Sequence, residues 1–270
     1  MKLLPIAALL LTGTSLLAST GVHAEDYQSF SSVSYSDLDN KHNDSDAFSL
    51  ATRYYFDKKS TLGPLDEFEY INKTSNVFGS FVDTDTNKNF NLGGEAFIDK
   101  LLVGATYHYS DFDHGGNEDI YTLSLGYLVS DDFLIKAVKH DNDDEYLFSA
   151  SYNHQINDSD YIGFTYSTDD DVDVQTLASK YFTDLGQGRY LTAEVSFSDY
   201  DDADNDLAGR VEYFFNSHTS VAGSYNDDED YSVSAKHFFN KNYALSASYQ
   251  SNTEDHIDYD LYTIDFTAQF

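Results

Sequence analysis

The sequence predicts an all-β chain that forms a transmembrane up-and-down antiparallel β-barrel of about sixteen strands. Apolar and polar residues alternate with a period of two along most of the chain, which is typical of strands whose two faces meet different surroundings. Acidic connections recur between these runs at a nearly constant spacing. After residue 24, no stretch is long and apolar enough to predict a transmembrane helix.

The N-terminal residues predict a secretory signal peptide. Lys2 precedes an apolar run over residues 3–11, and small residues then lead to Val22-His23-Ala24. The alternative is a membrane-anchoring helix, which needs about 20 apolar residues. Polar residues from Thr12 onward interrupt the run too early for that. We therefore predict cleavage after Ala24 and a single transmembrane barrel domain over residues 25–270.

The composition excludes several classes of protein. The chain has no Cys, so neither a disulfide nor a thiolate metal site can form. Its formal net charge of −32 disfavours nucleic-acid binding, which requires clustered Lys and Arg. A strongly acidic chain can be disordered, but an aromatic content of 16% and the persistent alternation argue against disorder here.

The alternation predicts the individual strands. In residues 48–56 the even positions are mainly large and apolar, and in residues 121–129 the odd positions are. The first run is weak and the third is irregular at 71–76, so fourteen strands remain an alternative. The predicted strands lie near 26–36, 45–56, 68–82, 88–98, 101–110, 120–129, 133–140, 145–154, 161–168, 174–182, 190–198, 207–215, 219–226, 231–239, 242–250 and 259–270.

Charged residues within the runs lie mostly opposite the aromatic face. A Lys or Arg that faces lipid at mid-membrane costs about 2–4 kcal/mol, whereas a water-filled lumen accepts the charge. These residues are therefore candidates for lining a pore, where they could form a transverse field or simply pair along the wall. They are Arg53, Glu95, Lys136, Lys180, Glu194, Arg210, Glu212 and Lys236.

The connections distinguish a membrane barrel from a soluble β-sandwich, because alternation alone fits both. Less acidic turns, with aromatic residues close by, lie midway between the acidic clusters. In a meander, every second connection lies at the same end, so the sequence predicts an acidic rim at one end and an aromatic ring at the other. The acidic clusters lie at 37–46, 83–85, 111–119, 141–145, 169–173, 199–206, 227–230 and 254–258.

The last run carries a family resemblance. Its apolar face, Tyr262, Ile264, Phe266 and the terminal Phe270, resembles the final strand of Gram-negative outer-membrane proteins. Residues 63–68 (GPLDEF) and 72–77 (NKTSNV) are similar to a segment of the general bacterial porins of marine gammaproteobacteria. The resemblance implies an outer-membrane location and recognition of the last strand by the barrel-assembly machinery. It also implies passive diffusion of small hydrophilic solutes, contact with lipid and lipopolysaccharide, and leaves a homotrimer open.

The sequence departs from this family in one respect. General porins narrow their lumen with a long third external loop, but the third acidic connection here, 111–119, is short. Strand side chains or the irregular segment 57–76 would therefore have to constrict the channel.

The acidic clusters contain two series with the opening rhythm of a calcium loop. Neither has the Gly at the sixth position and the Glu at the twelfth that such a loop requires. Loose Mg²⁺ or Ca²⁺ binding, bridging to lipopolysaccharide, and a solvated acidic rim both remain open. The series are Asp169, Asp171, Asp173 and Asp202, Asp204, Asp206.

No dinucleotide fingerprint, phosphate loop or nucleophile elbow is present, so we predict no catalytic residues, no cofactor and no enzymatic activity. The favoured function is a cation-preferring diffusion channel, because an acidic mouth concentrates cations. The first alternative is a structural or adhesive outer-membrane barrel whose acidic loops bind divalent cations or lipopolysaccharide. The second is a soluble periplasmic β-protein.

Overall fold

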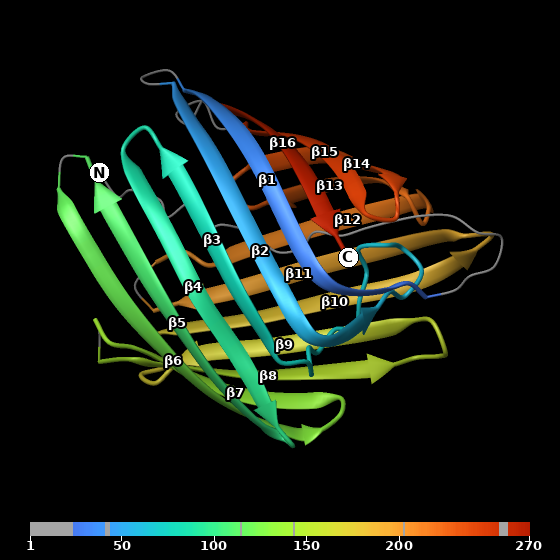
Figure 1. The fold of residues 1–270 in the computed structure, drawn as a ribbon, viewed down its shortest axis with the longest axis horizontal. Coiled ribbons are helices and arrows are strands. Elements are labelled where there is room, and N and C mark those ends of the chain that lie inside the picture. The colour runs from blue at the N-terminus through green and yellow to red at the C-terminus, as the bar shows by residue number, and fades with distance from the viewer. Residues whose placement is uncertain (1–23, 41–43, 114, 143, 202, 254–258) are drawn as a thin grey trace.

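The computed structural model describes residues 24–40, 44–113, 115–142, 144–201, 203–253 and 259–270. The predicted signal peptide, except for Ala24, lies outside these ranges, as do the whole acidic cluster 254–258 and parts of four other predicted acidic clusters (41–43, 114, 143 and 202). Sixteen antiparallel strands form one closed barrel (Figure 1). No helix within the described ranges is long and apolar enough to cross a membrane.

In chain order, the strands are β1 (Asp26–Asn40), β2 (Ser45–Ser60), β3 (Asn76–Thr84), β4 (Asn87–Ile98), β5 (Leu101–Phe112), β6 (Gly116–Ser130), β7 (Phe133–His140), β8 (Tyr146–Gln155), β9 (Tyr161–Asp169), β10 (Val174–Gly186), β11 (Arg189–Tyr200), β12 (Asp206–Asn216), β13 (Thr219–Asn226), β14 (Asp230–Asn240), β15 (Tyr243–Asn252) and β16 (Tyr259–Gln269). Each strand pairs with its sequence neighbours, and β1 pairs with β16.

Pairing between β1 and β16 closes the sheet. Their register runs from Phe30 opposite Gln269 to Asn40 opposite Tyr259. Beyond it, the backbone N–H groups of Gln28 and Ser29 donate to the carbonyl of Phe270 at 2.7 and 2.8 Å. Closure leaves no strand edge unpaired, which a hydrocarbon environment requires because it offers backbone groups no hydrogen-bond partner.

The predicted strands agree with the structure except at the third. Sixteen strands are present, so the fourteen-strand alternative is wrong. The weak first run is a full strand because it pairs with β2 on one side and β16 on the other. The third strand begins at Asn76 rather than at residue 68, because residues 61–75 leave the sheet.

The two faces of the sheet differ in polarity. On the outside, Val33, Leu50 and Phe266 lie side by side across three strands and are 40–42% exposed. On the inside, hydroxyls of neighbouring strands pair with each other, as between Ser34 and Ser49 at 2.5 Å. An apolar exterior of this extent around a polar interior is the arrangement that a bilayer demands of a barrel.

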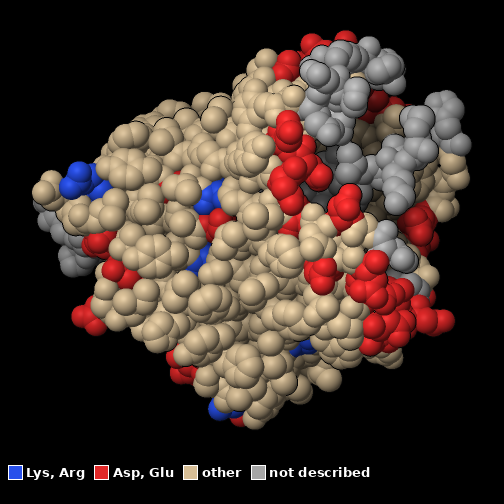
Figure 2. Space-filling view, turned by 180° about the vertical axis from the view of Figure 1, so that it is seen from behind, with Lys and Arg blue, Asp and Glu red and all other residues tan. Residues whose placement is uncertain are grey.

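The two ends of the barrel also differ. At one end, the acidic end, Asp and Glu side chains gather on the surface, whereas Lys and Arg lie mostly elsewhere (Figure 2). At the opposite end, the turn end, most connections have only two to five residues. The strand order places the start of β1 and the end of β16 together at the turn end.

Aromatic side chains lie at both ends, although the sequence predicted a ring at the turn end alone. Outward-facing tyrosines at the acidic end pack in pairs, such as Tyr107 with Tyr121, whose ring centroids are 5.1 Å apart. Several of their hydroxyls donate to rim carboxylates, as Tyr35 does to Asp46 at 2.6 Å. The ring contacts lipid while the hydroxyl reaches water, which is the usual use of tyrosine at an interface.

Candidate functional site

One connection at the turn end folds into the barrel. Residues 61–75, here called the inward segment, join β2 to β3 in place of a short turn. Leu65 and Glu67 of this segment are each only 3% exposed. The backbone N–H of Leu65 donates to the carbonyl of Ser217, in the turn between β12 and β13, at 3.2 Å. The segment therefore reaches strands that lie far from its own.

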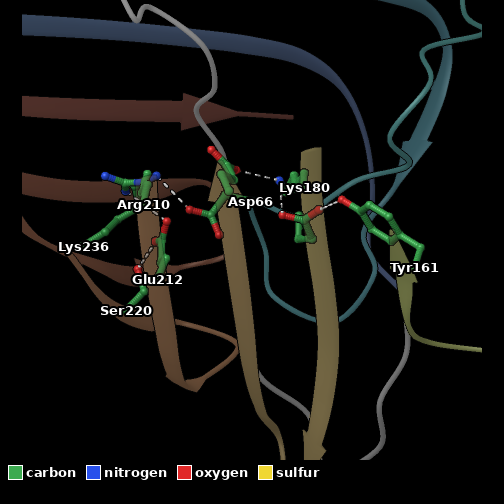
Figure 3. Close-up of polar contacts among 9 residues, drawn as sticks. Asp66, Tyr161, Lys180, Arg210, Glu212, Ser220 and Lys236 are labelled. Atoms are coloured by element: carbon green, nitrogen blue, oxygen red, sulfur yellow. Dashed lines mark hydrogen bonds and ion pairs between the residues drawn. The ribbon is translucent and has the colours of Figure 1, made fainter. Parts of the chain in front are cut away.

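Two carboxylates attach the inward segment to the far wall (Figure 3). Glu67 accepts hydrogen bonds from the Lys180 ammonium of β10, at 2.8 Å, and from the Tyr161 hydroxyl of β9. Asp66 accepts one from the Lys236 ammonium of β14, at 2.7 Å. Because β10 lies eight strands from β2 in a ring of sixteen, the segment extends across the full width of the lumen.

Burial changes the acidity of these two carboxylates. Removal from water raises the pKa of the Asp66 carboxyl, and the nearby Lys236 only partly offsets that rise. Burial likewise raises the pKa of the Glu67 carboxyl, against the opposing effect of Lys180. The ion pairs thus compensate charges that the barrel interior would otherwise disfavour.

Apolar contacts fill the lumen around the inward segment on one side. Leu65 packs with Tyr27, Phe238 and Ala244 from β1, β14 and β15. On the β9–β12 wall, Leu62 and Tyr70 pack against a second cluster, which contains Tyr161, Phe182, Tyr190 and Phe214. The side of the lumen from β9 round to β1 is therefore packed near the turn end.

A wall glycine provides the space for Tyr70. A Cβ added at Gly163 of β9 would lie 2.5 Å from the Tyr70 ring, so only glycine permits this close approach. The Tyr70 hydroxyl pairs with the Thr165 hydroxyl two residues further along β9, at 2.8 Å. At the base of the segment, the Lys59 ammonium donates to Glu69 at 2.7 Å and to Asn72 at 3.1 Å.

Open space remains along the opposite wall, from β2 to β9. One cavity of about 310 Å³ lies against Tyr70, Ile71 and Thr165, and a second of about 180 Å³ lies against Arg53 and Ser124. Glu95 and Lys136 line both cavities, so the two adjoin. The open space thus lies beside the inward segment and off the barrel axis.

The charged residues that the sequence predicted for the interior pair along the wall or with the inward segment. Lys136 contacts Glu95 at 2.6 Å, Lys180 contacts Glu194 at 3.5 Å, and Arg210 contacts Glu212 at 3.1 Å. Lys236 pairs with Asp66. Arg53 differs, because its guanidinium lies over the rings of Phe78, at 4.6 Å, and Tyr55, at 6.0 Å.

Sequence reasoning missed Asp66, Glu67 and Tyr161. A signal for the first two was available in the sequence, since they are adjacent carboxylates within the irregular segment 57–76 that was expected to constrict the channel. Tyr161 looked like an ordinary strand residue and carried no such signal.

The acidic clusters show no metal centre among the residues that the structure describes, where no three His, Asp or Glu side chains converge suitably. Asp169 instead accepts a hydrogen bond from the backbone N–H of Val174 at 3.2 Å. Asp206 lies close to Asp227 and Asp228, and Asp202 is outside the described ranges. Loose divalent binding therefore stays a prediction.

The final strand presents Tyr262, Ile264 and Phe266 on the outer face, where they are 42–57% exposed. Phe270 packs edge-on against Tyr243, with ring centroids 5.9 Å apart. Recognition of these residues by the assembly machinery remains a prediction.

Comparison with known proteins agrees with this architecture. The family model described as "Putative general bacterial porin" matches residues 1–270. No curated protein matches the chain. Among solved structures, outer membrane protein Omp33 of Acinetobacter baumannii is similar at 17% identity and a TM-score of 0.57, over 91% of this chain and 99% of that one.

Two further solved structures share the fold. OpdQ of Pseudomonas aeruginosa has 10% identity and a TM-score of 0.54, over 91% of this chain and 99% of its own. A triple mutant of the Rhodopseudomonas blastica porin has 11% identity and a TM-score of 0.53, over 92% and 100%. Identities this low show the fold alone, whereas the family match extends over the entire chain. The chain therefore belongs to the family of general bacterial porins and forms a channel in the outer membrane.

Proposed function

We propose that the protein is a passive diffusion channel for small hydrophilic solutes and ions, and that it prefers cations. The observation that carries the preference is the concentration of carboxylates at the acidic end (Figure 2). A mouth of one charge sign raises the local concentration of counter-ions and repels ions of the same sign. The lumen contributes less to the cation preference than the acidic end does, because most of its charged side chains are paired with each other or with the inward segment.

The inward segment sets the size of the passage in this proposal. It packs against the wall from β9 to β1 and leaves the space along β2 to β9. Solutes would pass through an opening much narrower than the barrel itself. This constriction comes from a connection at the turn end, which supports the sequence-based expectation that the short third acidic connection does not provide it.

Reversal-potential recordings in planar bilayers test the cation preference. Under a tenfold KCl gradient we expect the sign of the reversal potential that corresponds to a higher permeability for K⁺ than for Cl⁻. The preference should weaken as ionic strength rises, since the screening length falls from about 10 Å at 0.1 M to about 3 Å at 1 M. The rim variant Asp170→Asn/Asp171→Asn should be less selective than the native chain. Absence of conductance, or a preference for Cl⁻ at low salt, would refute the proposal.

A further inference from the structure

Arg53 is a lumen cation that makes no direct ion pair within the described part of the chain, although Glu95 lies near enough to interact with its charge. Within the described part of the chain its contacts are the rings of Phe78 and Tyr55, and no ion pair involves it. By contrast, Lys136, Lys180 and Arg210 each lie within ion-pair distance of a glutamate. The guanidinium N–H donors of Arg53 are thus available to a solute.

The wall orients this guanidinium. Phe78 lies close against β4, where a Cβ added at Gly93 would be 2.6 Å from the end of the Phe78 ring. A guanidinium that stacks on an aromatic face keeps its N–H donors free at its edge, because stacking uses the face of the group. Phe78 therefore serves as a platform that holds Arg53 beside the smaller cavity.

The smaller cavity combines this charge with hydroxyl groups. Its lining includes Thr106, Thr122 and Ser124 together with Glu95 and Lys136. Glu95 is engaged, since it accepts from the Lys136 ammonium at 2.6 Å and from the Asn76 amide at 3.5 Å. Two cations and one carboxylate leave one uncompensated positive charge, in a chain whose formal net charge is −32.

We propose that this cavity, the Arg53 site, binds small hydroxylated carboxylates on their way through the channel. The planar carboxylate would accept two parallel hydrogen bonds from the Arg53 fork, and the solute hydroxyls would pair with the threonine and serine hydroxyls. One uncompensated positive charge matches a singly charged anion. The inference rests on the proposed channel function and adds a solute class to it. The acidic mouth would slow the approach of such anions, while the Arg53 site would retain those that enter.

Blocking of single-channel K⁺ current by D-gluconate tests this proposal. D-Sorbitol is the matched control, because it keeps the carbon chain and the hydroxyls of gluconate and carries a neutral CH2OH group in place of the carboxylate. We expect gluconate, and not sorbitol, to reduce the current of the native channel. Arg53→Gln should weaken the block at least about tenfold, since it removes a charge-assisted bidentate contact. Arg53→Lys should be intermediate, because it keeps the charge and loses the fork.

Arg189→Gln is the control variant, since Arg189 lies at the start of β11 and lines neither cavity. It should leave the block unchanged. Calorimetric titration of gluconate into the detergent-solubilised protein examines the same site without any current. Gluconate that binds no better than sorbitol, or that binds Arg53→Gln as tightly as the native chain, would overturn the inference. A channel that conducts without gluconate binding would leave the proposed function intact, whereas gluconate binding without conductance would refute the channel function alone.

Discussion

At the scale of single residues, the contact between Tyr161 and Glu67 shows how the interior holds the inward segment. Tyr161 is 2% exposed, and its hydroxyl donates to a carboxylate that is itself buried. A hydrogen bond to a charged, buried acceptor contributes more than one at a wet surface, because neither partner can turn to water. Tyr161 therefore stabilises the docked segment as well as the strand that carries it.

Tyr161→Phe should lower the free energy of unfolding by about 1.5–3 kcal/mol, because it leaves one Glu67 oxygen without a donor. The matched control is Tyr166→Phe on the same strand. The Tyr166 hydroxyl lies on the outer face and donates to Gln175 at 2.9 Å in an exposed position, so this change should cost less than about 0.5 kcal/mol. Urea unfolding of both variants in detergent micelles measures the difference. An equal loss of unfolding free energy in the two variants would show that the buried hydrogen bond contributes no more to stability than the exposed one.

Alternation was enough to predict that Arg53 and Lys180 face the interior, because side-chain direction in a strand is a local property. Their partners could not be predicted in the same way. Lys180 meets Glu67 only because a segment 113 residues away in sequence crosses the lumen. Residues 50–55 around Arg53 (LATRYY) are similar in sequence to residues 177–182 around Lys180 (LASKYF). Among the described residues, however, the inward segment places no carboxylate in an ion pair with Arg53, whose guanidinium lies over aromatic rings.

At the scale of structural elements, the inward segment explains the one misplaced strand. Phe68 and Tyr70 alternate with Glu69 as strand residues do, and this alternation extended the predicted strand back to residue 68. In the structure, Phe68 and Tyr70 pack against two different apolar clusters inside the barrel rather than against lipid. Aromatic residues spaced two apart can therefore also occur in an irregular segment whose side chains enter separate apolar clusters, and a strand is only one structure that produces this spacing.

The two buried carboxyls of the inward segment, Asp66 and Glu67, should stabilise the folded state when the pH is lowered. Their pKa values are raised on folding, so the stability that they contribute is fully present below their unfolded pKa of about 4 and is lost as the pH rises through the raised value. The free energy of unfolding of the native chain, relative to Asp66→Asn/Glu67→Gln, should therefore increase as the pH falls from about 7 to about 4.

Urea unfolding of the two proteins at both pH values checks this sign. If acid instead destabilised the native chain relative to the variant, the ion pairs to Lys180 and Lys236 would outweigh burial as the determinant of these pKa values.

At the scale of the whole molecule, one closed sheet separates two solvents. Its outside is apolar and carries aromatic residues near both ends, while its inside is polar and contains paired charges. The strand number, the pairing order and the acidic end follow from patterns that repeat along the chain, and these were predictable from the sequence. The shape of the passage was not, because it depends on contacts of the inward segment that occur once and join distant residues.

The register allows most of the inward segment to be removed together with the last four residues of β2, at the cost of the pairs that Lys59 and Ser60 make with the start of β1. Tyr55 pairs with Asn76, and the backbone N–H of Phe56 donates to the carbonyl of Ser75 at 2.9 Å. Replacing residues 57–74 with Asn-Gly would thus join β2 and β3 by a tight hairpin turn, which that dipeptide favours.

Single-channel conductance of the native chain and of this shortened chain, in the same bilayer and salt, is the most direct test of a water-filled lumen narrowed by the inward segment. We predict that both chains conduct and that the shortened chain has the larger conductance. A native barrel that carries no current, or a shortened chain whose conductance is no larger than the native value, would contradict this account.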